Sequence, residues 1–369
     1  MGSAAGDLGP GGGRAPASEP APSFPVVEAE GAPYELGLAH GRQCAELVRR
    51  FARVGMPRYL GCAPEAMLGT VAAELPGYRR AIEQAAPALL EEMRGIADAA
   101  ALSLDEVLVL QLRPELGYVR RRRKEGCTSI GVRARRSRTG APLIAQNVDM
   151  ALELLDYGVI LRLRPRTGPA ILAWTLAGVV GQTGINSWGL GRCGNVVMSA
   201  GWRVGVPTAV LFRLALEQGT VGDVAALCAR LPRAKSNNFL LCDAANGLAC
   251  LELTVDQQRL LEAGADDVVV HANHYRHPDL VPHDVGPYGD GSRLREKRMA
   301  ELAAAARPIG EAELQGFMGD HVNAPHGICG HGVPGLQTIA ACVLNPAERR
   351  LWVSHGNPCA TGYRAYALA

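Results

Sequence analysis

The chain has 369 residues, of which 48% are hydrophobic and 20% are charged, and its formal net charge at pH 7 is only +2. This is the composition of a globular protein with ample apolar material for a core. A nearly neutral chain argues against a polyanion-binding protein, and no stretch approaches the ~20 consecutive apolar residues of a membrane helix. We therefore expect a cytoplasmic protein that binds neither nucleic acid nor membrane.

The first third of the chain is predicted to contain a flexible arm followed by helices. Residues 1–31 are rich in Gly, Pro, Ala and Ser and lack the apolar region of a secretory signal, which predicts a disordered arm. Residues 32–126 carry apolar side chains at helical spacing, as in "PYELGLAHGRQCAELVRRFARVGM" and "APALLEEMRGIADAA". A further helix begins at the capping box formed by Ser103 and Glu106.

The pattern changes to short strands at Cys127. The runs "CTSIGVRARR", "APLIAQNVDM" and "YGVILRLRPR" are typical of strands, and a hairpin with a turn at Asn246 and Gly247 is expected in "NNFLLCDAANGLACLELTV". Helices are predicted over 207–231 and 291–307. Hairpins grouped around helices, without regular βαβ alternation, favour an α+β class with a layered αββα architecture over a Rossmann sheet. We expect residues 127–369 to form one composite domain with 32–126.

The ten cysteines include no CxxC pair, so most are expected to be reduced and buried. Cys127 differs because Gly126 precedes it. A thiol can attack the carbonyl carbon of the preceding residue in an N-to-S acyl shift, and a glycine there has no Cβ to obstruct the attack. Hydrolysis of the resulting thioester would cut the chain between Gly126 and Cys127 and leave Cys127 as a new N-terminus.

A cysteine at an N-terminus carries a nucleophile and a base on one residue. An α-amine has a pKa of about 7.7–8.0, against ~10.4 for lysine, so much of it is neutral near pH 7. Such an amine suits a general base that accepts the proton of the adjacent thiol, whose pKa is near ~8.5. The Gly126–Cys127 pair alone is a weak signal, because buried cysteines far outnumber catalytic ones.

Several short motifs strengthen this interpretation because of their order along the chain. "EGCTSIGV", "GAPLIAQNVDM", "GINSWGL", "NNFLLCD", "HANHY", "GSRLREKR" and "DHVNAPHGICGH" follow one another in an arrangement that resembles the isopenicillin N acyltransferase family (acyl-coenzyme A:6-aminopenicillanic acid acyltransferases). The resemblance covers roughly residues 32 to 369. It implies a four-layer αββα sandwich and an autoproteolytic cysteine N-terminal-nucleophile hydrolase, in which 32–126 and 127–369 become a small and a large chain.

The resemblance also implies roles for individual residues. Cys127 matches the nucleophile of both self-cleavage and catalysis, and Asp149 matches the aspartate that holds the new amine. Asn273 matches an asparagine whose amide donates a hydrogen bond to the tetrahedral oxyanion. Arg293 resembles an arginine that braces the site, although Arg295 can fill the same role and the sequence leaves the choice between them open.

Three further residues are expected to support the site. Asn186, in "GINSWGL", corresponds to a backbone donor to the oxyanion in the related choloylglycine hydrolases, and Asn147 belongs to the same Asn-x-Asp element as Asp149. Ser292 is expected to assist self-cleavage. Gln146 departs from the arginine of choloylglycine hydrolases, which argues against a bile-acid-type site. Taken singly, Asp149 and Asn273 also fit a turn residue and a strand cap.

Two other stretches offer competing interpretations. His321, His326, Cys329 and His331 could ligate zinc, but their spacing matches no known finger, so neither a metal nor any other cofactor is expected. The cations from Arg120 to Lys124 could bind phosphate, and an exposed loop before the scissile bond is the plainer interpretation.

The sequence therefore predicts an amide hydrolase or acyltransferase that acts through an acyl-Cys127 intermediate. Its substrate is expected to be a small N-acyl amide or acyl thioester, and the two chains are expected to stay associated after cleavage. Both a monomer and a homo-oligomer remain open. The alternative is an unprocessed, non-catalytic binding protein with the same fold.

Overall fold

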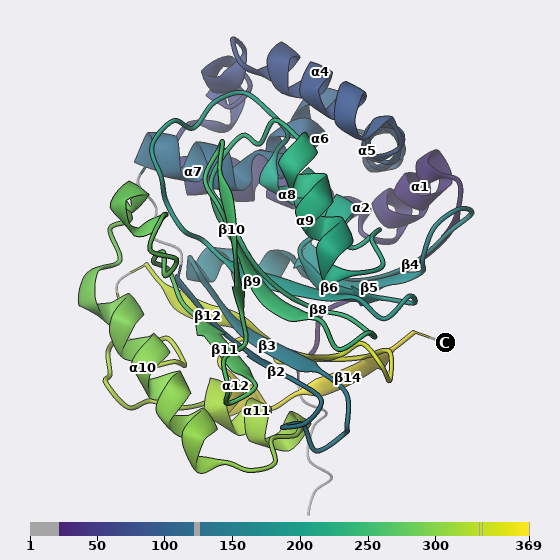
Figure 1. The fold of residues 1–369 in the computed structure, drawn as a ribbon. Coiled ribbons are helices and arrows are strands. Elements are labelled where there is room, and N and C mark those ends of the chain that lie inside the picture. Colours follow the sequence, from purple (N-terminus) through teal and green to yellow (C-terminus); the bar gives the residue numbers. More distant parts are fainter. Residues whose placement is uncertain (1–21, 122–125, 332, 334, 369) are drawn as a thin grey trace, which may run out of the picture.

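The computed structural model describes residues 22–121, 126–331, 333 and 335–368. Two stacked β-sheets form the centre of the protein, and helices cover both outer faces (Figure 1). One sheet has eight strands in the order β1-β4-β5-β6-β7-β8-β9-β10, and the other has six in the order β11-β2-β3-β12-β13-β14. The expected four-layer αββα sandwich of the α+β class is therefore confirmed.

The eight-stranded sheet is antiparallel except where β1 runs parallel to β4. Its strands are β1 (Val26–Gly31), β4 (Gly158–Pro165), β5 (Ile171–Leu176), β6 (Thr183–Asn186), β7 (Gly191–Asn195), β8 (Asn237–Cys242), β9 (Leu248–Leu253) and β10 (Gln258–Glu262). The six-stranded sheet is antiparallel throughout. Its strands are β2 (Gly126–Val132), β3 (Leu143–Met150), β11 (Val268–His271), β12 (Gln337–Asn345), β13 (Arg350–Val353) and β14 (Arg364–Ala367).

The helices form two separate groups. The first group belongs to the outer layer of the eight-stranded sheet: α1 (Pro33–Gln43), α2 (Ala45–Arg50), α3 (Met56–Leu60), α4 (Leu75–Ala85), α5 (Pro87–Ala100), α6 (Leu104–Gln111), α7 (Arg113–Arg121), α8 (Thr208–Ala215) and α9 (Val221–Arg230). The helices α10 (Gly289–Ala305) and α11 (Glu311–Met318) pack on the six-stranded sheet, and the short α12 (Pro358–Thr361) contacts α11 and β12. None of the helices in the described ranges is both long and apolar enough to cross a bilayer.

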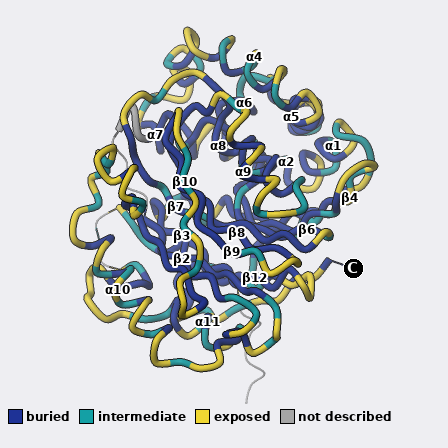
Figure 2. The backbone as a smooth tube through the Cα atoms, viewed as in Figure 1, coloured by how far each residue is buried: buried dark blue, intermediate teal, exposed yellow. Residues whose placement is uncertain are grey.

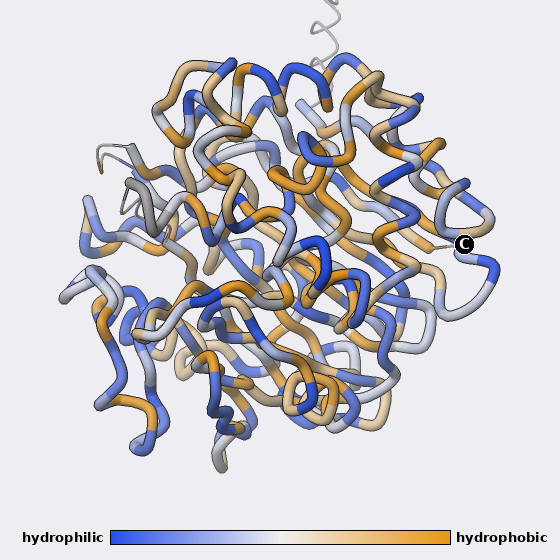
Figure 3. The backbone as a smooth tube through the Cα atoms, turned by 90° about the horizontal axis from the view of Figure 1, so that it is seen from above, coloured by the Kyte–Doolittle hydropathy of each residue, from blue (hydrophilic) through white to orange (hydrophobic). Residues whose placement is uncertain are grey.

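Burial follows this layering. The inner strands of both sheets are buried almost without interruption, whereas the edge strands β1, β10 and β14, helix α10 and the outer loops carry exposed residues (Figure 2). Hydrophobic stretches run through the interior in the perpendicular view, and many of the outer turns are hydrophilic (Figure 3). Strands with helices on one face and a second sheet on the other have no solvated face, so their sequences are hydrophobic without clear alternation.

The alternation of side chains along β2 decides which way Cys127 points. Ile130 and Val132 belong to the apolar cluster beneath α10 and α11. A Cβ added at Gly131 would instead meet the side chains of Leu240 and Leu248 in the opposite sheet. Because alternate residues of a strand face the same side, Cys127 faces the space between the sheets.

Two sequence predictions need correction. Residues 26–31 are not part of a disordered arm, because they form β1 and pair with β4; residues 1–21 lie outside the described ranges. The predicted helix over 207–231 is two helices, because Thr220 caps a new helix by accepting a hydrogen bond from the backbone N–H of Asp223. The capping box at Ser103 and the hairpin turn at Asn246 are confirmed.

Candidate active site

Cys127 lies at the beginning of β2, the strand between β11 and β3 in the six-stranded sheet, and only 4% of it is exposed. Its backbone N–H donates a hydrogen bond to Oδ1 of Asn273, at a donor–acceptor distance of 2.9 Å. This nitrogen belongs to the Gly126–Cys127 peptide bond and would become the α-amine after cleavage. Asn273 therefore contacts the atom that the predicted chemistry would release.

Arg295 of α10 holds the side chain of Asn273. One guanidinium nitrogen donates to Oδ1 of Asn273 at 2.7 Å, and its Nε donates to the hydroxyl of Thr128 at 3.0 Å. The same Oδ1 atom therefore accepts hydrogen bonds from both Arg295 and the Cys127 nitrogen. Hydrogen bonds from a charged donor are stronger than neutral ones, so Arg295 fixes this acceptor firmly.

The amide nitrogen of Asn273 has a second function. It donates to the backbone carbonyl of Val196 at 2.9 Å, and this contact joins the segment to the eight-stranded sheet. A side-chain amide carries two N–H donors, so this contact uses only one of them. Both sheets thus contribute to the position of Asn273.

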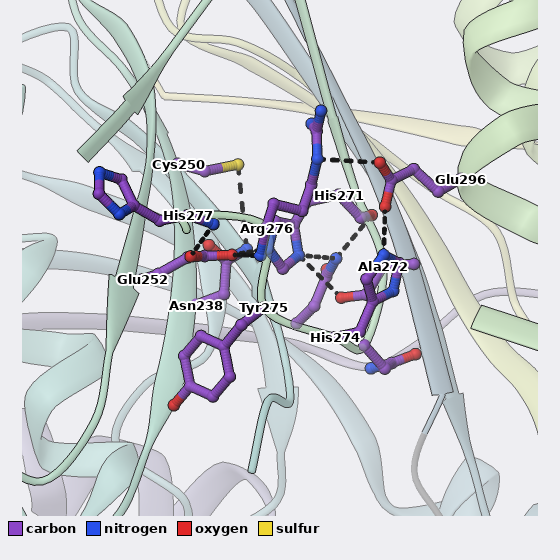
Figure 4. A network of polar contacts seen from close by, with 12 residues as sticks. Asn238, Cys250, Glu252, His271, Ala272, His274, Tyr275, Arg276, His277 and Glu296 are labelled. Carbon is purple, nitrogen blue, oxygen red and sulfur yellow. Dashed lines mark hydrogen bonds and ion pairs between the residues drawn. The ribbon is translucent and has the colours of Figure 1, made fainter. Parts of the chain in front are cut away.

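A buried polar network supports the segment that carries Asn273 (Figure 4). Nε2 of His271 lies 2.7 Å from a carboxylate oxygen of Glu252, and both side chains are fully buried. The backbone N–H groups of Arg276 and His277 also donate to Glu252, at 2.7 and 3.0 Å. Burial would raise the pKa of Glu252, but these contacts outweigh it and lower the pKa, which keeps the carboxylate charged.

A second carboxylate, Glu296 of α10, completes this network. One of its carboxylate oxygens lies 2.9 Å from Nε2 of His274, and the other lies 2.9 Å from Nε of Arg276. Nδ1 of His274 lies 2.7 Å from the hydroxyl of Ser292, which in turn accepts the backbone N–H of Asn273 at 2.8 Å. The buried carboxylate of Glu252, the partly buried carboxylate of Glu296 and the hydroxyl of Ser292 therefore fix the backbone on both sides of Asn273.

Asp149 lies opposite Gly126 on the neighbouring strand β3. A Cβ added at Gly126 would lie 3.0 Å from Oδ2 of Asp149, so this carboxyl group packs directly against the residue before the scissile bond. Its Oδ1 accepts from the hydroxyl of Thr338 at 2.6 Å. Burial raises the pKa of Asp149, and the charge of Arg295 and the Thr338 hydrogen bond oppose that shift only in part.

A pocket between the two sheets lies next to Cys127. Its lining includes Gln146, Val148 and Met150 from β3, and residues 194–196 from the end of β7 and just beyond. Three cations, Arg113, Arg192 and Lys235, also line it, and its described lining contains no carboxylate. Asp149 and Arg295 line a different pocket, on the α10 side of β2 and β3, together with Gly126. The thiol and the carboxyl group thus lie on opposite faces of one sheet.

Arg192 gives the pocket between the sheets its clearest electrostatic feature. Its guanidinium lies over the rings of Phe212 and Phe239, with ring-centroid distances of 3.3 and 4.7 Å, and donates to the Gln182 carbonyl at 2.5 Å. Its Nε is buried without a hydrogen-bond partner among the described atoms. Burial lowers the pKa of Arg192 to about 9, although the thiols of Cys193, Cys228 and Cys127 act in the opposite direction. The group is therefore still positively charged at neutral pH.

The structure does not bring two of the sequence-predicted residues to the site. The backbone N–H of Asn186 donates to Leu190, and its side chain bonds the carbonyls of Leu216 and Gln218, so it is a turn residue and does not line the Cys127 pocket. Arg293 is exposed on α10, whereas Arg295, two positions further along the helix, is buried against Asn273. The bracing role expected for Arg293 thus falls to Arg295.

The other two support residues act on the surroundings of the site. Asn147 donates from its side chain to the carbonyls of Met318 and Ile328, at 2.8 and 2.9 Å, and so ties β3 to α11 and to the loop that follows it. Ser292 contacts Asn273 and His274 as described above. The cation run from Arg120 to Lys124 has no described position for its side chains, because residues 122–125 and the side chains of the preceding cations lie outside the described residues.

Sequence reasoning missed Asn195, which follows Gly194 at the end of β7. It lines the Cys127 pocket, donates from Nδ2 to the His271 carbonyl at 2.7 Å, and has a buried Oδ1 without a partner among the described atoms. Its only sequence signal is a Gly-Asn pair that ends a strand. Many turns share that signal, and only the packing of the two sheets against each other places this residue opposite Cys127.

The fold and the site define an αββα protein with a buried cysteine at the beginning of a central strand. The family model for acyl-coenzyme A:6-aminopenicillanic acid acyl-transferase matches residues 136–360, which is more than half of the chain. The chain belongs to this family of acyltransferases, as the sequence motifs predicted.

The individual proteins that the chain resembles have low sequence identity to it. The chain is 26% identical over 345 residues to the 40 kDa form of acyl-coenzyme A:6-aminopenicillanic-acid-acyltransferase from Emericella nidulans, and the match covers 90% of this chain and 92% of the relative. Among solved structures, a variant of conjugated bile acid hydrolase from Clostridium perfringens aligns with 13% identity and a TM-score of 0.46, covering 66% of this chain and 97% of that one. Penicillin V acylase from Agrobacterium tumefaciens aligns with 14% identity and a TM-score of 0.45, covering 66% and 86%.

Proposed function

We propose that the protein is an autoproteolytic N-terminal-nucleophile enzyme that takes an acyl group from a small amide or thioester and holds it on Cys127. The observation that carries this proposal is the hydrogen bond from the Cys127 nitrogen to Asn273, braced by Arg295. Every buried backbone N–H needs an acceptor, and a backbone carbonyl of a neighbouring strand usually supplies it. Here the acceptor is a side-chain oxygen held by the buried cation of Arg295, an arrangement that can also hold a catalytic amine in place after cleavage.

The first step is self-cleavage of the bond between Gly126 and Cys127. The sulfur of Cys127 attacks the Gly126 carbonyl carbon, the C–N bond breaks as the C–S bond forms, and the thiol proton ends on the released amine. Water then hydrolyses the thioester to a Gly126 carboxylate and a regenerated Cys127 thiol. Asp149 packs against Gly126, where its carboxyl group can accept and return a proton during these steps.

Turnover uses the same sulfur. The new α-amine of Cys127 accepts the thiol proton, and the sulfur attacks the carbonyl carbon of the substrate. The second amide N–H of Asn273 is the donor that we assign to the oxyanion. The amide nitrogen of Asn195 already contacts the carbonyl oxygen and Nδ1 of His271, at 2.7 and 3.4 Å. The resulting ammonium returns its proton to the leaving amine or thiol. Water as the acceptor of the acyl group gives hydrolysis, and an amine gives transfer.

The small and large chains are expected to stay associated after cleavage. Strand β1 of the small chain pairs with β4 of the large one, and one continuous apolar core contains residues of both. A buried ion pair, Arg213 with Glu92 at 2.9 Å, also crosses from one to the other. Separation would expose this core and leave two buried charges unpaired, which is strongly unfavourable.

A gel-based experiment tests the proposal against an unprocessed binding protein. Wild-type chain is expected to separate into two fragments under denaturing conditions, whereas Cys127→Ala is expected to stay intact and inactive. Cys62→Ala, a half-buried cysteine remote from the site, is the matched control and should process normally. Activity is measured on a panel of N-acyl amides and acyl thioesters, with and without an added amine acceptor. An intact wild-type chain, or normal processing of Cys127→Ala, would reject the proposal.

A further inference from the structure

Four potential metal ligands gather in a second cluster, outside the site of Cys127. His321, Cys329 and His331 come from the loop between α11 and β12, and Cys359 comes from the short helix α12. One ligand atom from each of the four residues lies within 4.8 Å of the other three. The spacing within the loop matches no zinc finger, which argued against a metal on sequence alone. The fold favours a metal site, because it brings Cys359, 28 residues beyond His331, next to the loop as a fourth ligand.

The separations among Cys329, His331 and Cys359 match those of a tetrahedral thiolate–imidazole centre, and His321 lies beside them within 4.8 Å. Zinc bonds of about 2.3 Å to sulfur and about 2.0–2.1 Å to nitrogen place two sulfurs roughly 3.8 Å apart and a sulfur and nitrogen roughly 3.5 Å apart. The sulfurs of Cys329 and Cys359 are 3.7 Å apart. Nε2 of His331 lies 3.3 Å from the sulfur of Cys329 and 3.2 Å from that of Cys359. The rings of His321 and His331 meet edge to face, with centroids 4.9 Å apart.

The surrounding groups hold these ligands in place. The backbone N–H of Cys329 donates to the carbonyl of Asp320, next to His321, and the carboxylate of Asp320 is bound by Arg298 at 2.7 Å. The side-chain nitrogen of Asn357 lies 3.4 Å from the sulfur of Cys329 and donates to the carbonyl of Gly330 at 2.9 Å. An N–H group directed at a sulfur stabilises a thiolate and is common around metal-bound cysteines.

We propose that His321, Cys329, His331 and Cys359 bind one Zn²⁺ ion as a structural site. Binding removes one proton from each thiol, and both protons pass to solvent. The two thiolates then balance the charge of the ion, and the two histidines bind as neutral rings. Four protein ligands complete the tetrahedron and leave no position for water or substrate, so the ion stabilises the fold and takes no part in the reaction.

The site would fix the loop that forms one wall of the pocket at Gly126. Gly330 lies between two of the ligands and lines that pocket. Its backbone N–H donates to the hydroxyl of Thr338, and that hydroxyl donates to Asp149. Asn147 bonds the carbonyl of Ile328 at the other side of Cys329. The ion would therefore hold the loop against β3 and α12.

Metal content and ligand spectroscopy test this proposal independently of activity. The wild-type chain is prepared with reductant and zinc, desalted against a weak chelator, and analysed by elemental mass spectrometry. Cys359→Ser and His321→Ala remove surface ligands, so both variants should fold. Cys62→Ser and His283→Ala are the matched controls outside the cluster. Replacement of zinc by Co²⁺ adds a thiolate-to-cobalt absorption band as evidence of sulfur ligation.

The expected result is one zinc ion per chain in the wild type and in both controls, and loss of most of the zinc in Cys359→Ser and His321→Ala. The cobalt band should weaken in Cys359→Ser and stay unchanged in Cys62→Ser. Three results would overturn the proposal: a wild-type chain without zinc although its thiols are reduced, zinc retention in both ligand variants equal to that of wild type, or a disulfide between Cys329 and Cys359 in the freshly purified protein.

Discussion

Replacement of Arg295 by methionine tests whether the charge on α10 positions the acceptor of the Cys127 nitrogen. Arg295 is 7% exposed and donates to Oδ1 of Asn273 at 2.7 Å and to the hydroxyl of Thr128 at 3.0 Å. Methionine keeps most of the length of the side chain and removes both donors. Without Arg295, Asn273 can turn away from the nitrogen that it holds.

The size of the effect follows from the energy of the lost contact. A hydrogen bond to a charged group contributes about 1.5–3 kcal/mol. If this contact acts in the transition state of self-cleavage, its loss slows processing by about 10- to 150-fold, because each ~1.4 kcal/mol corresponds to tenfold in rate. The variant should also raise the pKa of Asp149 further, because the charge of Arg295 now lowers it. The pH profile of processing should therefore move to higher pH.

The assay follows newly translated full-length chain and its two fragments on a denaturing gel, with thermal unfolding measured in parallel. Arg293→Met is the matched control, because Arg293 is exposed on the same helix, two positions earlier. Arg295→Lys keeps the charge but not the planar fork that reaches both acceptors, and it should lose less activity than the methionine variant. Normal processing by a stably folded Arg295→Met, or equal slowing by Arg293→Met, would refute this reasoning.

Three further predictions concern residues around Cys127. In the uncleaved Cys127→Ala chain, Asp149→Asn should raise thermal stability increasingly as the pH rises from about 4 to 7. Burial raises the pKa of Asp149, so its stabilising contribution is complete at acid pH and is lost as the pH rises through the folded-state pKa, at a rate of at most about 1.4 kcal/mol per pH unit. A stability difference independent of pH would contradict this. Gly126→Ala should slow processing about tenfold, since its Cβ would lie 3.0 Å from Oδ2 of Asp149, whereas Gly316→Ala, with open space around its Cβ, should process normally in the same gel assay. Arg192→Met should lower kcat/KM for succinyl amides, whose acyl group carries a carboxylate, about tenfold or more, because the pocket loses one of its three buried cations. Uncharged butyryl amides should be nearly unaffected, and an equal loss for both substrates would show that Arg192 acts on folding alone.

The sequence was most informative where chemistry is local. The Gly126–Cys127 pair combines a nucleophile with an unobstructed carbonyl in two adjacent residues. The capping box at Ser103 likewise depends on residues three apart. Such features are visible without knowledge of the fold, because the atoms involved are close in the chain.

The features that were missed depend on contacts between distant segments. Strand β1 is stabilised by pairing with β4, more than 120 residues away, and its six residues are too few to give a clear strand pattern of their own. Asn195 reaches the pocket only because β7 packs across from β2. Helical geometry, which turns Arg293 outward and Arg295 toward Asn273, separates two arginines that the sequence presents as equivalent.

The most direct measurement is peptide mass spectrometry of the purified wild-type protein after brief incubation with an acyl thioester and quenching in acid. A large chain that begins at Cys127, with the acyl group attached to that residue as a thioester that hydroxylamine removes, is the predicted result. An uncleaved chain that turns over the thioester at full rate, or an acyl group carried by any other residue, would contradict the account.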